Sequence, residues 1–172
     1  MKILETERLV LRTWTLSDAP ELFEICADAE VMKYIGMGKP YETIEQANEF
    51  LRWAIDYQKA NNFCRWAVIL KDNRKIVGSC GFARPHGTTE IELGYFLARK
   101  FWGKGLATEA AGACLRYGFE NLNFREIIAM TDLENVASQK VLEKIGFAQR
   151  GIETFNGEEN LVYLAKNPVN IR

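Results

Sequence analysis

The segment from Arg99 to Ala110 contains the residue types of an anion-binding loop. Gly103 and Gly105 stand in a short connection between a strand pattern and a helix pattern. Glycines let the backbone approach a ligand closely, and the free N–H groups and positive dipole at the start of a helix favour an anion. The positive side chains nearby are Arg99, Lys100 and Lys104. Taken alone, the segment is equally well a tight strand-to-helix connection with its lysines in solvent.

The spacing of the glycines excludes two common nucleotide-binding motifs. A P-loop requires G-x-x-x-x-G-K-[ST], which the chain does not contain. A dinucleotide-binding fingerprint requires a third glycine, and Thr108 stands at that position. The charge balance also argues against a polybasic surface for nucleic acid, because 22 basic residues face 23 acidic ones, for a net charge of −1. We therefore expect no direct nucleic-acid partner, and the charge balance still allows a local basic site for one phosphate group.

The cysteines and the single histidine do not form a metal-binding pattern. No two cysteines make a C-x-x-C pair, and His86 stands alone in a turn. Separated cysteines in apolar runs are usually buried free thiols of a reducing compartment, so we expect neither a metal nor a catalytic thiol. Charges close to Met1 argue against a signal peptide, and no stretch of about 18 apolar residues could span a membrane. The expected location is cytoplasmic, with no membrane partner.

Hydrophobic periodicity outlines the elements that must position the loop. It predicts strands at about 8–15, 63–70, 75–82, 89–98, 126–131, 148–155 and 160–166, about seven in all. Helical spacing and caps predict helices from about Ser17, from Thr43 to Lys59, from Leu106 to Phe119 and from Asn135 to Ile145. Hairpin turns are expected at 71–74 and at Asn156-Gly157. This order predicts one α+β domain over residues 1–172, with a mixed, mostly antiparallel sheet and helices on both faces.

The loop and its flanks resemble the acetyl-CoA-binding motif of the GCN5-related N-acetyltransferase (GNAT) superfamily. The similar stretches are Glu92–Leu97 and Phe101–Ala110. The family's Q/R-x-x-G-x-G/A pattern is matched by Lys100-x-x-Gly103-x-Gly105, with lysine at the Gln/Arg position. The run from Asn135 to Phe147 is similar to the family's N-x-x-S-x-x-(V/A)-(L/Y)-E-K-x-G-F helix. The run from Arg8 to Arg12 is similar to the first strand of its ribosomal-protein (RimJ/RimL-like) branch.

The resemblance implies a GNAT-type fold and acetyl-CoA as co-substrate, with no metal. Backbone groups of Phe96, Leu97 and Ala98 would pair with the pantetheine arm as a further strand does. The pyrophosphate would lie against the loop and helix start, which comprise Lys100, Gly103, Lys104, Gly105, Leu106, Ala107 and Thr108. Asn135 would offer its amide to the pantetheine, a role compatible with capping the helix that follows. Ser138 would lie beside it.

The implied reaction is direct attack of a primary amine on the thioester carbon in a ternary complex. A backbone N–H near Phe96 or Leu97 would bind the oxyanion. Many GNAT enzymes protonate the leaving thiolate with a tyrosine just before the E-K-x-G-F run, where this chain has Leu142. Ser138 is the substitute candidate for this acid. The alternatives are that Ser138 only binds pantetheine or caps the helix, and that the thiolate leaves unprotonated.

The base that deprotonates the amine has two candidates. Glu92 comes first, because it lies on the strand that leads to the cofactor. Glu90, on the same face, is the rival, and a solvated carboxylate is the alternative for both residues. Tyr95, on the same strand, is expected in the core.

The predicted function is therefore acetyl-CoA-dependent N-acetyl transfer. The acceptor would be a protein N-terminal amine or a small-molecule amine, with residues 28–42 and the C-terminal hairpin flanking its cleft. The acidic side chains Glu153, Glu158 and Glu159 of that hairpin either attract a cationic amine or form a solvated charged surface. A non-catalytic acyl-CoA-binding sensor of the same fold is the alternative function. The resemblance also brings the expectation of a homodimer, which no residue pattern tests.

Overall fold

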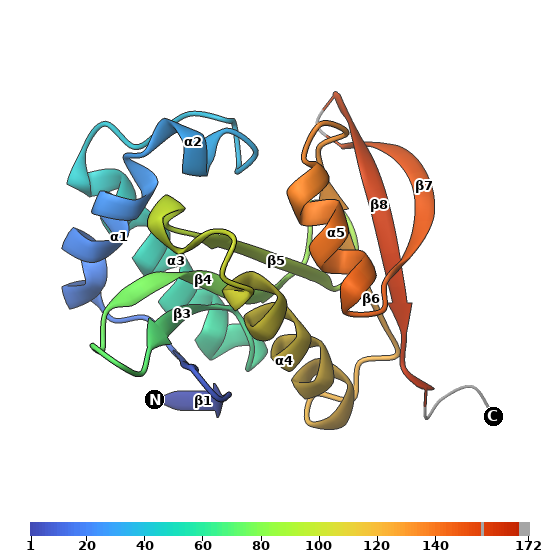
Figure 1. Ribbon diagram of the computed structural model, residues 1–172, viewed down its shortest axis with the longest axis horizontal. Coiled ribbons are helices and arrows are strands. Elements are labelled where there is room, and N and C mark those ends of the chain that lie inside the picture. The colour runs from blue at the N-terminus through green and yellow to red at the C-terminus, as the bar shows by residue number, and fades with distance from the viewer. Residues whose placement is uncertain (156, 169–172) are drawn as a thin grey trace.

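Eight strands form one sheet in the computed structural model, which describes residues 1–155 and 157–168 (Figure 1). The strands are β1 (Lys2–Glu5), β2 (Leu9–Arg12), β3 (Arg65–Leu70), β4 (Ile76–Ala83), β5 (Glu92–Leu97), β6 (Glu126–Thr131), β7 (Ala148–Phe155) and β8 (Glu158–Lys166). Their spatial order is β1-β2-β3-β4-β5-β6-β8-β7. Within the described residues, neighbouring strands pair antiparallel except β5 and β6, which run parallel. The predicted mixed, mostly antiparallel sheet is confirmed.

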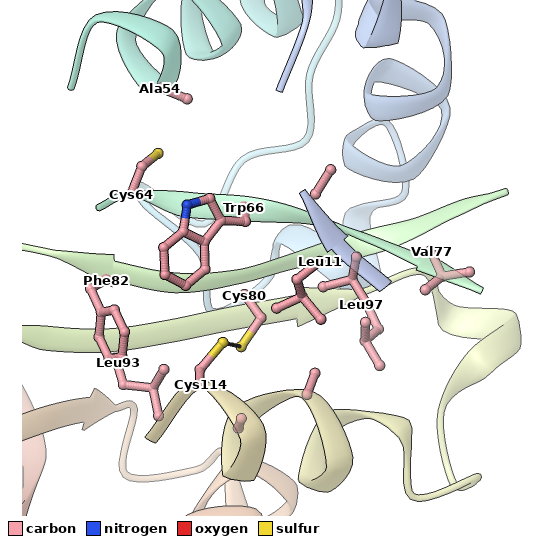
Figure 2. Packing of buried hydrophobic residues seen from close by; sticks show 14 of the residues in the cluster. Leu11, Ala54, Cys64, Trp66, Val77, Cys80, Phe82, Leu93, Leu97 and Cys114 are labelled. Atoms are coloured by element: carbon pink, nitrogen blue, oxygen red, sulfur yellow. Dashed lines mark hydrogen bonds between the residues drawn. The ribbon is translucent and has the colours of Figure 1, made fainter. Parts of the chain in front are cut away.

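Helices pack on both faces of the sheet. They are α1 (Ala19–Cys26), α2 (Ala29–Met32), α3 (Ile44–Asn61), α4 (Leu106–Glu120) and α5 (Val136–Lys144), with short 3-10 turns η1 (Leu16–Asp18) and η2 (Arg99–Phe101). In Figure 2, Ala54 of α3 lies on one side of the strands and Cys114 of α4 on the other. Between these layers Trp66 and Phe82 are completely buried and meet edge to face at 5.8 Å. This packed core gives β4 and β5 a rigid support.

Two helices begin at the capping residues that the sequence predicts, Thr43 and Asn135. Gln46 Oε1 accepts a hydrogen bond from the backbone N–H of Thr43 (3.0 Å), which is the return bond of a capping box at the start of α3. Asn135 Oδ1 accepts from the N–H of Ser138 (3.2 Å) and so caps α5. α4 instead begins directly after Gly105, with no side-chain cap. Its first N–H groups therefore lack a partner in the helix.

β5 and β6 separate soon after they meet. Their registered pair is Glu92 with Ile128, supported by a hydrogen bond from the N–H of Ile128 to the carbonyl of Ile91 (2.8 Å). Beyond this point β5 stays paired with β4 as far as Leu97, whereas β6 pairs with β8. The free side of β5 consequently presents backbone donors and acceptors that no described strand satisfies. This opening is the feature that the fold offers to a ligand.

Two elements escape the sequence prediction. β1 is a four-residue edge strand paired with β2, and its two half-buried apolar residues, Ile3 and Leu4, are too few to show a period. α2 is a single helical turn inside residues 28–42, where hydrophobic periodicity predicts no helix. The other predicted elements are present, although β2 and β5 are shorter than expected. Of the predicted hairpin turn, Asn156 lies outside the described residues.

Across residues 1–155 and 157–168, no helix combines the length and the apolar character that crossing a bilayer requires.

Candidate functional site

A pocket of about 610 Å³ opens where β5 and β6 separate. One wall is the end of β5, from Tyr95 to Leu97, and the floor is the turn that leads into α4. The opposite wall is the start of α5, from Asn135 to Val141. Residues of α2 and of the segment after it close the remaining side. The pocket thus joins segments that lie up to about a hundred residues apart in the chain. Its volume is in the range of pockets that bind small molecules and cofactors.

The turn before α4 has the geometry of an anion-binding loop. Gly103 and Gly105 have φ values of 71° and 74°, a region that only glycine enters without strain of about 1–2 kcal/mol. The first residues of α4 line the pocket directly after Gly105, and their unpartnered N–H groups lie at the positive end of a 15-residue helix. The indole N–H of Trp102 donates to the carbonyl of Leu97 (2.7 Å), which ties the turn to the end of β5.

Arg8, just before β2, braces the same turn. Its Nη1 donates to the carbonyl of Lys104 (2.9 Å) and its Nε to Glu109 Oε2 (2.6 Å). Burial alone would raise the pKa of Glu109, but hydrogen bonds from Thr6 and from Arg8 outweigh it, so the pKa lies below its usual value. Glu109 therefore stays ionised and is matched by Arg8. Its charge, in the first turn of α4, is compensated and does not repel an anion at the loop.

The direction of the β5 backbone follows from its pairing with β4. The N–H of Ala98 donates to the carbonyl of Val77 (2.8 Å), and Leu97 is in register with Gly78. Backbone groups alternate sides along a strand, so the N–H groups of Phe96 and Ala98 face β4. Those of Tyr95 and Leu97 face the opening. Between Phe96 and Leu97, the geometry favours Leu97 as the donor toward a ligand.

The start of α5 brings a hydroxyl to the opposite wall. Asn135 uses its side-chain oxygen to cap the helix, so its amide nitrogen is the group on offer to a ligand. The oxygen of the Ser138 side chain lies 2.9 Å from the phenol oxygen of Tyr95. Tyr95, which was expected in the core, is partly buried and packs against the core, and it also lines the pocket. No local pattern could have shown this contact, because the two residues are 43 positions apart.

Comparison with known proteins decides the family. Residues 8–148 match the sequence model described as "Acetyltransferase (GNAT) domain". The chain belongs to the GNAT acetyltransferase family. It is 36% identical over 153 residues to "Uncharacterized N-acetyltransferase p20" of Bacillus licheniformis, in a match that covers 88% of this chain and 85% of that one.

Solved GNAT structures share the fold. An acetyltransferase (GNAT family) from Bacillus anthracis is similar with a TM-score of 0.83 and 30% identity, and the match covers 97% of this chain and 99% of that one. RimL, described as a ribosomal L7/L12 alpha-N-protein acetyltransferase in complex with coenzyme A, has a TM-score of 0.83 at 16% identity. That match covers 96% of this chain and 98% of RimL, and it shows a common fold.

Most of the residues predicted to contact acetyl-CoA line the pocket of this GNAT chain. They are Phe96, Leu97, Gly103, Gly105, Leu106, Ala107, Thr108, Asn135 and Ser138. Ala98 and Lys100 line a neighbouring cleft of about 490 Å³ instead. The carbonyl of Lys104 accepts a hydrogen bond from Arg8, and its ammonium group lies over the ring of Phe101, 5.6 Å from the centroid. Ala98, Lys100 and Lys104 are therefore absent from the described lining of the pocket.

The positive charge of the pocket comes from an unexpected element. Arg99 pairs with Asp28 (3.1 Å), and Lys100 lies 3.9 Å from Glu24. The lysines in the pocket wall are Lys140 and Lys144 of α5. They are four residues apart and so share a helix face, but only the docking of α5 shows that this face looks into the pocket.

The two candidate bases are both engaged in ion pairs. Glu92 accepts a hydrogen bond from Arg65 Nη2 (2.6 Å), and its side chain is only 13% exposed. Glu90 is held by Arg150, which also binds Glu153. The described lining of the pocket includes neither carboxylate; the acids that it includes are Glu30 and Glu134.

The described lining of the pocket includes none of the four cysteines. The cysteines are free and buried, and burial raises the pKa of Cys26 and of Cys64 to about 12. Cys80 and Cys114 lie with their sulfurs 3.5 Å apart in the core (Figure 2). Among the described residues, no group of three or more His, Cys, Asp or Glu could hold a metal ion.

Proposed function

We propose that this GNAT chain transfers the acetyl group of acetyl-CoA to a primary amine, with residues 1–172 acting as one catalytic domain. The observation that carries the proposal is the pocket at the separation of β5 and β6. There a glycine turn at the start of a helix, the free side of a strand and a serine side chain line one pocket. Acetyl-CoA offers a matching series of groups, namely a pyrophosphate, two amides and a thioester. RimL, which shares the fold, is described as a complex with coenzyme A, and this agrees with the proposed ligand.

The pyrophosphate would bind the N–H groups from Gly103 to Thr108. Their orientation is preset by the two left-handed glycines and by the Arg8 brace, so little ordering is needed on binding. Lys140 and Lys144 would add positive charge across the pocket from this turn. The pantetheine amides would meet the free side of β5 and the Asn135 amide, as an added strand does.

The chemistry would occur between the end of β5 and Ser138. As the amine attacks, the carbonyl oxygen gains negative charge, and the N–H of Leu97 is placed to stabilise it. The carbon–sulfur bond then breaks, and the electron pair stays on sulfur. Ser138 would donate a hydrogen bond to that sulfur. Leu142, at the position of the family's usual tyrosine, is 1% exposed and bears no hydroxyl, so Ser138 takes its place.

Glu92 is the proposed base. Its carboxylate is paired with Arg65, and a substitution that removes the negative charge tests the role. Free α-amines titrate near about 8, so a base matters more at pH 7 than at pH 9. Glu92→Gln should therefore lower kcat/KM at pH 7 and have a smaller effect at pH 9. An equal kcat/KM for Glu92→Gln and the unchanged protein at pH 7 would remove the role.

For the acceptor we propose a cationic primary amine, either a protein N-terminus or a small molecule. Glu30, Tyr34 and Glu134 line the pocket, and carboxylates attract an ammonium group. RimL is described as acting on a ribosomal protein. A cytoplasmic location agrees with the four free cysteines. A homodimer is also proposed, and measurement of the mass in solution would test it.

The deciding experiment measures release of free thiol from acetyl-CoA. A panel of N-terminal peptides, polyamines and amino-sugar amines would be tested, with mass spectrometry to confirm the acetylated product. We expect thiol release that depends on one acceptor class and saturates with acetyl-CoA. If acetyl-CoA binds and no acceptor raises thiol release above background, the chain acts as an acyl-CoA sensor and the proposed function is wrong.

A further inference from the structure

Tyr95 and Ser138 form a contact across the pocket that neither the family match nor the sequence assigns. The phenol oxygen of Tyr95, on β5, lies 2.9 Å from Ser138 Oγ and 3.2 Å from the Ser138 carbonyl. Both residues line the pocket. The contact joins the two walls between which acetyl-CoA would lie, at the level where α5 begins. It therefore lies beside the groups to which the reacting end of the thioester is assigned.

The hydrogen count at Ser138 shows why this contact matters. A serine hydroxyl has one hydrogen and two lone pairs, and a phenol can either donate or accept. If the single Tyr95 hydrogen goes to the Ser138 carbonyl, the phenol oxygen accepts from Oγ, and the Ser138 hydrogen points at Tyr95 and is withheld from a ligand. If Tyr95 donates to Oγ, that hydrogen is left to point into the pocket. The direction of this single bond thus decides whether Ser138 can serve as a donor.

Two features favour donation from Tyr95 to Oγ. The contact with Oγ is the shorter of the two, and the Ser138 carbonyl already lies in the first turn of α5, where a helix supplies it with an N–H from Leu142. Burial also raises the pKa of the Tyr95 phenol, although the bond with Ser138 acts in the opposite sense. The phenol therefore keeps its hydrogen over the whole physiological pH range.

We propose that Tyr95 is the positioning residue of the reaction: its hydroxyl donates to Ser138 Oγ and so directs the Ser138 hydrogen at the sulfur of coenzyme A. No proton leaves Tyr95. As the nitrogen–carbon bond forms and the carbon–sulfur bond breaks, sulfur keeps the electron pair and receives the hydrogen bond of Ser138. The amine gives its proton to the proposed base, Glu92, and the thiolate is protonated on release. The helix has no hydroxyl at Leu142, so the hydroxyl of Ser138 takes that role, and the phenol of Tyr95 on β5 orients it. The inference rests on the proposed function for the identity of the sulfur.

Three variants and a matched control test this role. Tyr95→Phe removes the hydroxyl and keeps the ring, Ser138→Ala removes the proposed donor, and the double variant tests their coupling. Tyr163→Phe is the control. The Tyr163 hydroxyl also contacts α5, at Glu143 (3.4 Å), but Tyr163 is buried and lies outside the described pocket lining. Equal melting temperatures for Tyr95→Phe and Tyr163→Phe establish that both fold.

The readout is the pKa of the thiol of bound coenzyme A, followed by the ultraviolet absorbance of its thiolate. This needs no acceptor and is independent of turnover. A hydrogen bond to the thiolate should hold that pKa below the value in water, and Tyr95→Phe should raise it by about 1. Ser138→Ala and the double variant should raise it equally, because Tyr95 acts only through Ser138. Tyr163→Phe should leave it unchanged.

Kinetics with the acceptor gives the second readout. Tyr95→Phe should lower kcat by about threefold to tenfold and leave the acetyl-CoA Kd within about twofold, and the double variant should match Ser138→Ala. An unchanged thiol pKa in Tyr95→Phe, or losses that multiply in the double variant, would overturn the positioning role. Failure of coenzyme A to bind at all would instead overturn the proposed function, and with it the sulfur on which this inference depends. A normal thiol response without any acceptor turnover would uphold the Tyr95 role and refute the transferase.

Discussion

Gly105→Ala separates backbone strain from ligand binding at the loop. The new Cβ would lie 3.6 Å from Arg8 Nη2 and nearer to no other protein atom outside its chain neighbours, which is an ordinary contact. The protein itself therefore has room for the methyl group. The unfavourable effect on folding comes from the φ of +74°, a left-handed conformation that alanine adopts at a cost of about 1–2 kcal/mol.

That strain converts into a measurable melting shift and a separate loss of affinity. For a chain of this size, about 1–2 kcal/mol corresponds to a decrease in Tm of roughly 2–8 °C. If alanine turns one N–H of the loop away from the pyrophosphate, a hydrogen bond to a charged group worth about 1.5–3 kcal/mol is lost. The Kd for acetyl-CoA should then rise by about tenfold to a hundredfold.

The assay compares Gly105→Ala with Gly87→Ala. Gly87 has a φ of +79° with nothing within 4 Å of a built Cβ, and it lies in the turn before β5 and outside the described pocket lining. Thermal unfolding should show similar decreases for both variants. Calorimetric titration should show weaker acetyl-CoA binding for Gly105→Ala alone. Equal and unchanged Kd values in the two variants would show that the phosphates do not bind at this turn.

Three further changes have expected outcomes. Asp18→Asn removes a carboxylate that accepts two hydrogen bonds from Arg12 (2.7 and 2.8 Å) and should lower the free energy of unfolding in urea by about 2–4 kcal/mol. Burial would raise the pKa of Asp18, but Arg12 and Thr15 lower it overall; its contribution should be complete above about pH 4 and fall as the pH decreases further, a dependence that Asp18→Asn should lose. The double change Lys140→Ala with Lys144→Ala should weaken acetyl-CoA binding, and most at low salt. The control Lys59→Ala, on the exposed side of α3, should leave binding unchanged. A difference in Kd that does not depend on salt would contradict an electrostatic role for the two lysines. Arg8→Ala should destabilise the fold by about 1–3 kcal/mol and weaken acetyl-CoA binding. Arg8→Lys should restore both properties only in part, because lysine has one nitrogen and cannot bond Glu109 and the Lys104 carbonyl as arginine does. Full recovery of the unfolding free energy and of the acetyl-CoA Kd in Arg8→Lys would refute the role of Arg8 in holding the turn.

The glycine turn before α4 was predictable because its causes are local. Gly103 and Gly105 are required by backbone conformation, and the helix that follows supplies its own unpartnered N–H groups. The capping residue Asn135 belongs to the same class, since a cap acts within three residues of itself. Glycine turns and helix caps depend on neighbouring residues in the chain, so short stretches of sequence are enough to predict them.

The charges around the turn were harder to assign from the sequence. Lys100 lies next to the loop in the chain, yet it faces Glu24 and a neighbouring cleft. Lys140 and Lys144 lie far along the chain and yet line the pocket. A long side chain can turn to either side of the backbone, and its direction is set by the partners that folding brings near.

The residue order alone thus established the family, the alternation of strands and helices, the glycine turn and the candidate hydroxyl of Ser138. It could not show the separation of β5 from β6, the brace from Arg8 to Glu109, or the phenol of Tyr95 beside Ser138. These three features join residues between 36 and 101 positions apart. Their pairing depends on how the helices dock on the sheet, because packing in the core and not local conformation decides which distant side chains meet.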